Sequence, residues 1–184
     1  LRKGIAGEGL VGKLNEAKKK LEKAKDEAKA EQKALQEEWE HKLRIAVMDA
    51  ESASTGQRTH LQEELAVLYN NHGSALKKAG DLQRAEEMYK RAIQNRMAVG
   101  GEETVDLAPI LINLAAVHLN QGHASEAEPL FARAYALRLH TLGESNQSTI
   151  AAKKWLIKCR SSGQRAESAG GRPQDMPPGS SGSH

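Results

Sequence analysis

Aromatic residues are scarce in this chain, at 3% of its 184 residues. Because β-sandwiches depend on aromatic and β-branched side chains, this shortage favours a helical core built from Ala, Leu, Ile and Val. The one cysteine, Cys159, excludes an internal disulfide and is consistent with a reducing compartment. No apolar run approaches the roughly 20 residues that span a bilayer, so no membrane insertion is expected. The length predicts one domain with flanking segments.

The N-terminus lacks the apolar centre of a signal peptide. The chain starts at Leu1 and not at Met, which is compatible with a fragment of a longer protein. We therefore expect a cytosolic protein by default. The net charge of +3 is mildly basic and does not indicate a dedicated nucleic-acid binder.

Motifs for cofactor chemistry are incomplete. Residues 7–14 nearly spell a phosphate-binding loop, but Leu14 stands where that loop needs Ser or Thr, and no strand is predicted before it. The histidines, including His118, His123 and His140, show no metal-binding spacing supported by cysteine or paired carboxylates. No nucleophile, base and orienting residue can be grouped. We expect no enzyme activity, no cofactor and no metal.

The N-terminal third divides into two segments. Glycines 4, 7, 9 and 12 predict a flexible lead-in over residues 1–12. Residues 13–52 contain neither Gly nor Pro and are rich in helix formers, which predicts one long charged helix. Leu14, Leu21, Ala28 and Leu35 recur every seven residues, as in a coiled coil. The helix either pairs through this seam or stays solvated and is held by Glu–Lys pairs four residues apart.

Residues 58–160 map onto themselves at an offset of 42 residues, without gaps. In this alignment, Asn71 corresponds to Asn113 and Gly80 corresponds to Gly122. Each unit reads as a helical hairpin, with helices near 59–79 and 82–98, then near 106–120 and 124–141. Residues 146–160 are predicted to form the first helix of a third, truncated unit. This helix caps the open end of the stack, which Trp155, Leu156 and Ile157 are expected to cover with apolar side chains. Residues 161–184 are rich in Ser, Gly and Pro and predict a disordered tail.

Both units carry the same pattern of small and aromatic residues. A small residue is followed by Ala after 12 positions, an aromatic after four more and Ala after three more. The residues concerned, which we expect to pack the repeats together, are Gly73, Ala85, Tyr89 and Ala92, then Ala115, Ala127, Phe131 and Ala134. The pattern resembles the tetratricopeptide repeat. The segments INLAAVHLNQG, SEAEPLFARAYALR and TLGESNQST are similar to the 42-residue type of kinesin light chains and nephrocystin-like proteins. The link at residues 99–102 departs from it.

The resemblance implies an all-α fold: a short tetratricopeptide-repeat α-solenoid of two helical hairpins plus a capping helix, preceded by the long charged helix. It also implies a peptide-binding groove lined by the first helix of each unit. The matching positions are Asn70, Asn71, Ser74, Lys77, Lys78, Ile112, Asn113, Ala116, Asn120, Lys154 and Lys158. Asn71 and Asn113 either hold an extended peptide or tie neighbouring helices together. The four lysines predict an acidic ligand, unless they are ordinary solvated side chains. We expect Trp155 to belong to the cap.

Two arginines, Arg96 and Arg138, occupy equivalent places late in the second helix of each unit. We expect them to pair with acidic residues of the following turns, such as Glu102 and Glu144. Two repeats and a fraction are close to the minimum for independent stability, so the domain is expected to fold back on its N-terminal helix, dimerise or dock on a partner.

The function expected from this organisation is a non-enzymatic adaptor or scaffold that binds a partner protein segment in the groove. The helix at 13–52 offers a second contact by helix–helix pairing. The alternative is a structural subunit of a microtubule-based or ciliary assembly.

Overall fold

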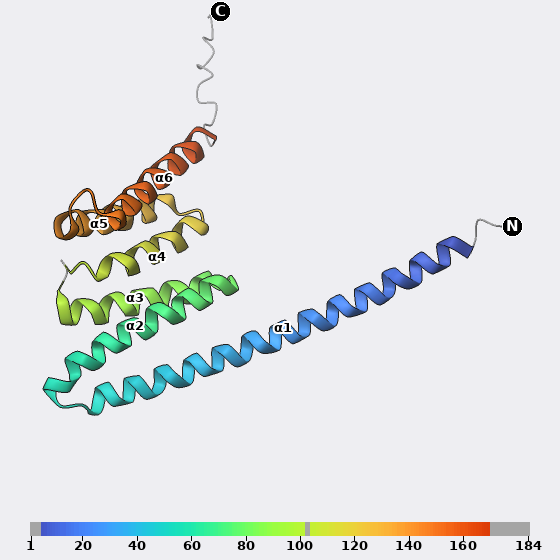
Figure 1. The fold of residues 1–184 in the computed structure, drawn as a ribbon, viewed down its shortest axis with the longest axis horizontal. Helices are drawn as coiled ribbons and strands as arrows, with labels where there is room; N and C mark the ends of the chain where they lie inside the picture. The colour runs from blue at the N-terminus through green and yellow to red at the C-terminus, as the bar shows by residue number, and fades with distance from the viewer. Residues whose placement is uncertain (1–4, 102–103, 170–184) are drawn as a thin grey trace, which may run out of the picture.

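The computed structural model describes residues 5–101 and 104–169. Within these ranges the chain forms six helices and no strand, which confirms the all-α prediction. The helices are α1 (Ile5–Ser52), α2 (Thr55–Ala79), α3 (Leu82–Gly100), α4 (Leu107–Asn120), α5 (Ala124–Leu142) and α6 (Gln147–Ala169). Helices α2 to α6 form a stack. The C-terminal part of α1 lies alongside α2 at one end of that stack, and its N-terminal part extends far beyond the stack (Figure 1).

Glycines terminate the helices at the predicted turns. Gly80 and Gly122 both have φ of 86°, a left-handed conformation that glycine adopts without steric cost. After each of them the chain hydrogen-bonds back to the helix end: the N–H of Asp81 donates to the Leu76 carbonyl at 3.0 Å and that of His123 to the His118 carbonyl at 2.8 Å. This pattern satisfies carbonyls that a helix end otherwise leaves unpaired. The turns α2–α3 and α4–α5 are therefore equivalent in structure as well as in sequence.

All eight residues predicted to pack the repeats are buried. The two helices of the first hairpin approach closely at Gly73. A Cβ atom added to Gly73 would lie 2.9 Å from Cε1 of Tyr89, so at this backbone separation only glycine fits under the ring. The second unit has Ala115 and Phe131 at these positions, and both side chains are fully buried. Small residues on the first helix thus let the aromatic ring of the second helix fill the space between them.

Helix α1 contacts the repeats only near its C-terminal end. Residues 11–34 are exposed, whereas Leu43 is buried and Val47 and Ala50 pack against the same core cluster. These three residues precede Ala85, Tyr89 and Ala92 by 42 positions. The end of α1 therefore covers α2 as the second helix of a preceding repeat would. Folding back on the N-terminal helix, one of the three predicted ways to complete the short stack, is the one observed.

Polar contacts fix this docking. The Trp39 ring of α1 stacks on the His72 ring of α2, with centroids 5.6 Å apart and planes 8° from parallel. Glu40 of α1 accepts a hydrogen bond from Arg84 of α3 at 2.8 Å. The His72 side chain is only 2% exposed. Neither of its ring nitrogens has a hydrogen-bond partner in the part of the chain that the structure describes.

This environment makes the docking of α1 sensitive to acid. Burial, followed by the nearby Arg84, lowers the pKa of His72, and Glu40 opposes them weakly. The unfolded chain therefore binds a proton at this histidine more readily than the folded chain does. The contribution of the neutral His72 side chain to the free energy of unfolding is complete above about pH 6.5 and is lost as the pH falls below that value. Asp81 and His72 line one small cavity, so Asp81 adds a second carboxylate near the ring.

We expect Tm to fall by a few degrees between pH 7.5 and 5.5, and by clearly less in His72→Phe, which keeps a stacking ring but does not titrate. Equal slopes in a differential scanning fluorimetry series would contradict this role of His72.

Several predicted boundaries differ from the structure. Helix α1 begins at Ile5, so the flexible lead-in predicted for residues 1–12 is wrong from residue 5 onward; residues 1–4 lie outside the described residues. A glycine costs a helix about 1 kcal/mol relative to alanine but does not block it, and the long run of helix formers that follows can propagate through it. Helix α2 begins at Thr55, before the predicted start near residue 59, so only residues 53 and 54 separate it from α1.

The capping helix is also longer and differently oriented than predicted. Helix α6 continues to Ala169, past the predicted end at residue 160; residues 170–184 of the predicted tail lie outside the described residues. Within this extension, Gly163 lies close to α5, since a Cβ added to it would be 3.7 Å from the Cβ atom of Ala124. Leu156 is buried, but Ile157 is 57% exposed, so the prediction that Ile157 covers the stack is wrong. Adjacent helix positions point about 100° apart, and the buried residues of α6 include Thr149, Ala152, Leu156 and Cys159.

Candidate protein-binding groove

A hydrogen-bonded cluster joins the first helices of the two units. Lys77 of α2 donates from Nζ to Oδ1 of Asn113 on α4 at 3.2 Å. The Nδ2 atom of Asn113 donates in turn to Oδ1 of Asn70 on α2 at 3.1 Å. The three residues come from the predicted groove set, and the structure places them together, partly buried, between α2 and α4. Below, they are called the Asn–Lys cluster.

The Asn–Lys cluster is anchored to the core of the first hairpin. The Ser74 hydroxyl donates to the backbone carbonyl of Asn70 at 3.0 Å. The same hydroxyl lies 3.1 Å from the hydroxyl of Tyr89, whose ring fills the space beside Gly73. Burial raises the pKa of Tyr89, and the hydrogen bond with Ser74 acts in the opposite direction. The tyrosine therefore stays neutral and holds its end of this polar chain in place.

The positive charge of Lys77 has no counter-ion in the described part of the chain. No carboxylate there lies within ion-pair distance of its Nζ atom, which sits 5.8 Å from the centre of the Tyr89 ring. Burial, and then the neighbouring Lys78, lower the pKa of Lys77. Both effects disfavour the charged form, so an anionic group brought to this position would be attracted and would relieve them.

Asn71 and Lys78 face a different neighbour. Both line an open cavity of about 710 Å³ between α2 and α1, which Ser74 also borders. From α1 the lining comes from Ala28, Glu31, Gln32, Leu35 and Trp39. Thus Asn71 and Asn113, although equivalent in sequence, do not face one space, because α1 lies beside the first and α2 beside the second. The structure divides the predicted groove into the Asn–Lys cluster and this cavity.

The remaining predicted groove residues are not joined to the cluster. Ile112 and Ala116 are half-buried on α4, and Ile112 packs into the core. Asn120 is exposed at the end of α4. Lys154 and Lys158 are exposed on α6, where Nζ of Lys158 lies 5.0 Å from the Trp155 ring centre. Trp155 stacks on Phe131 with centroids 6.0 Å apart, as a capping residue would.

Of the two late-helix arginines, Arg96 pairs with an acidic residue of the following turn, as predicted, whereas Arg138 binds a backbone carbonyl and not an acidic residue. Arg138 donates to the backbone carbonyl of Ser148 at 2.9 Å, while Glu144 pairs instead with Lys153 at 3.2 Å. Arg138 thus ties α5 to the start of α6 without a carboxylate. Nη1 of Arg96 lies 3.8 Å from Oδ2 of Asp106. The predicted partner Glu102 lies outside the described residues.

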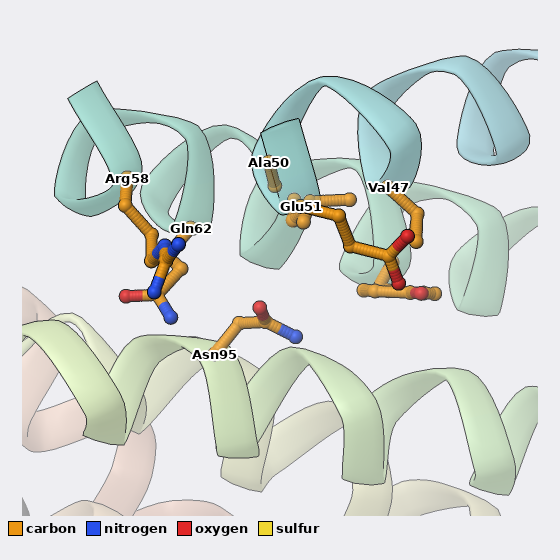
Figure 2. A pocket seen from close by; sticks show the side chains of 8 residues that line it. Val47, Ala50, Glu51, Arg58, Gln62 and Asn95 are labelled. Atoms are coloured by element: carbon orange, nitrogen blue, oxygen red, sulfur yellow. The ribbon is translucent and has the colours of Figure 1, made fainter. Parts of the chain in front are cut away.

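A second cavity, of about 470 Å³, opens where α1 ends and α2 begins. Figure 2 shows Glu51 and Val47 of α1, Arg58 and Gln62 of α2, and Asn95 of α3 around this space. Sequence patterns did not indicate it, because its lining depends on the docking of α1. Its charged and amide rim provides hydrogen-bonding groups, but none of its lining residues is a partly buried lysine that donates to an asparagine, as Lys77 is.

Comparisons with known proteins bear on the repeat region. Residues 64–140 match the family model described as tetratricopeptide repeat. No curated protein matches the chain significantly. Among solved structures, the chain is similar to the crystal structure of BtubC (BKLC) from P. vanneervenii, with 22% identity and a TM-score of 0.48. That alignment covers 77% of this chain and 59% of the other. None of the described helices is long and apolar enough to cross a membrane.

Proposed function

We propose that this chain, which carries tetratricopeptide repeats over residues 64–140, is a non-enzymatic adaptor that binds an extended acidic segment of a partner protein. Repeats of this kind are in general scaffolds for protein–protein interaction. The observation that carries the proposal is the half-buried Lys77, which is hydrogen-bonded to Asn113 and lacks a carboxylate partner among the described residues.

The Asn–Lys cluster retains the groups that an extended peptide needs. An asparagine amide offers two N–H donors and two acceptor sites. In Asn113, one donor and one acceptor site are used inside the cluster. The remaining N–H and lone pair can pair with the carbonyl and N–H of a bound backbone. Lys77 has further N–H donors for an acidic side chain, and such charge-assisted bonds are stronger than neutral ones.

Binding of acidic peptides tests this proposal. A fluorescein-labelled peptide of alternating Glu and Ala should raise its anisotropy on addition of the full chain, and a Lys–Ala peptide of equal length should not. Lys77→Glu should weaken binding by at least about tenfold, because it puts like charge against the ligand. Lys154→Glu makes the same change of charge on α6 away from the cluster and should cost much less.

Salt provides a second readout, since an ionic contact weakens as screening increases. Unchanged affinity in Lys77→Glu, with an unchanged circular dichroism spectrum, would rule out the groove model.

A second candidate function is a structural subunit of a microtubule-based or ciliary assembly. The observation that favours it is the exposed part of α1, where Leu14, Leu21 and Leu35, which occupy the same position of a seven-residue repeat, are 54%, 56% and 49% exposed. An exposed seam of this kind suits pairing with another helix. In that case the chain should self-associate or sediment with a larger assembly, and Leu14→Glu with Leu21→Glu should abolish this without changing peptide binding.

A further inference from the structure

The turn between α4 and α5 brings together three side chains that ligate metals. His118 lies in the last turn of α4, His123 precedes α5, and Glu126 lies in the first turn of α5. Their ligand atoms all lie within 4.8 Å of one another. Nδ1 of His118 is 3.2 Å from one carboxylate oxygen of Glu126, and Nδ1 of His123 is 4.0 Å from the other.

The innermost of these groups is buried and unsatisfied. The His118 side chain is only 6% exposed. Its Nδ1 atom has no hydrogen-bond partner among the described residues, since the nearby carboxylate of Glu126 is within ion-pair distance but not in hydrogen-bonding geometry. A buried imidazole nitrogen without a partner is costly, and a metal ion in the space between the three side chains would satisfy it.

Repeat packing does not account for these residues. The offset of 42 places Leu76, Asp81 and Arg84 at the same positions in the first unit. There, Leu76 is a core residue and Asp81 caps α3 by accepting from the Arg84 N–H at 3.1 Å.

The second unit keeps neither of these roles. A polar imidazole replaces the leucine, and His123 makes no side-chain capping bond. Glu126 contacts no lysine or arginine within the described ranges, where its ionic contacts are with His118 and His123. The second unit thus has metal-ligating groups where the first unit has a core leucine, a capping aspartate and an arginine that pairs with Glu40 of α1.

We propose that His118, His123 and Glu126 form a binding site for a divalent transition-metal ion, with Zn²⁺ as the natural probe. Two imidazole nitrogens and one carboxylate suit Zn²⁺ and its neighbours better than Mg²⁺ or Ca²⁺, which prefer all-oxygen ligands. His123 and Glu126 are 54% and 59% exposed at the side chain, so both can rotate to the shorter ligand distances that a metal requires. Three protein ligands leave a fourth position for water or for a partner's side chain.

The sequence did not indicate this site because its ligands straddle a turn. His118 and His123 are five residues apart, with Gly122 between them. On one continuous helix that spacing would not place them on a common face. The left-handed Gly122 reverses the chain direction and brings the three ligands together.

Calorimetric titration of the full chain with ZnCl2 tests the proposal. We expect one equivalent to bind, with a rise in Tm of about 5 °C at zinc well above Kd, and no rise with MgCl2. Glu126→Gln and His123→Ala should each weaken zinc binding by at least about tenfold. Both residues are more than half exposed, so neither change should unfold the protein. His140→Ala, an exposed histidine later on α5, is the matched control and should leave binding unchanged.

Two outcomes would overturn the proposal. One is the absence of a stoichiometric zinc equivalent. The other is zinc binding that survives in the Glu126→Gln, His123→Ala double variant or is lost equally in His140→Ala, since the ion would then bind elsewhere. A Co²⁺ absorption spectrum that changes between the intact chain and Glu126→Gln would support a carboxylate ligand directly, independently of any peptide bound in the groove.

Discussion

Deleting residues 1–53 is expected to lower Tm by more than about 10 °C, because the end of α1 replaces a missing repeat. Leu43 is buried against the core of the first hairpin, and burial of such a side chain contributes about 1.5–3 kcal/mol. The stacking of Trp39 on His72 adds about 0.5–1.5 kcal/mol. The half-exposed Glu40–Arg84 pair adds only about 0–1 kcal/mol.

The loss matters because domains of this size have a small free energy of unfolding. With the half-buried Val47 and Ala50 included, the deletion removes roughly 5 kcal/mol. A typical domain has about 5–15 kcal/mol in total, and each kcal/mol corresponds to about 2–4 °C at this length. Deletion of residues 1–27 is the matched control. It removes most of the exposed part of α1 and keeps the docked part, so Tm should hardly change. A similar Tm for both deletions would show that α1 does not complete the stack.

Phe131→Ala is expected to cost about 3–5 kcal/mol, the usual range for removing a buried aromatic side chain. Phe131 is fully buried and shares a core cluster with Ala115, Leu156 and Cys159, so it holds the second hairpin to α6. Removing the ring leaves a cavity that neighbouring helices cannot readily close. Chemical denaturation should show a lower midpoint, together with earlier loss of α6 protection in hydrogen exchange.

Two further variants test whether the loss of stability comes from core packing at Phe131 or from a general sensitivity of α6 to substitution. Trp155→Ala removes the half-exposed ring stacked on Phe131 and should cost clearly less than Phe131→Ala. Ile157→Ala, at a position 57% exposed, should be nearly neutral. A larger effect at Ile157 than at Phe131 would contradict the observed orientation of α6.

Much of the repeat architecture is encoded locally and was predictable. Gly80 and Gly122 end helices because glycine alone adopts their φ without strain. A small residue and an aromatic residue recur at the same spacing, as Gly73 and Tyr89 and then as Ala115 and Phe131, because each hairpin must bring two helices close together. These requirements act within about 20 residues of chain and repeat at every unit, so the sequence repeats with them.

The candidate groove was predicted only in part. Asn70, Ser74, Lys77 and Asn113 belong to the predicted set, and the structure joins them. The division of that set, with Asn71 and Lys78 turned toward α1, depends on which helix lies on each side of α2. Helical periodicity gives the direction of a side chain on its own helix, but not the neighbour that it meets.

The sequence by itself determined the helices, their turns and the small and aromatic residues that pack each hairpin, since these follow from local propensity and a repeated pattern. Only the tertiary structure decided that α1 folds back on α2 through Trp39 and His72, and that the chain reversal at Gly122 gathers His118, His123 and Glu126. The physical reason is the same in both cases. These contacts join side chains on different helices, and the energy that selects them comes from burial and charge in the assembled fold, not from periodicity along the chain.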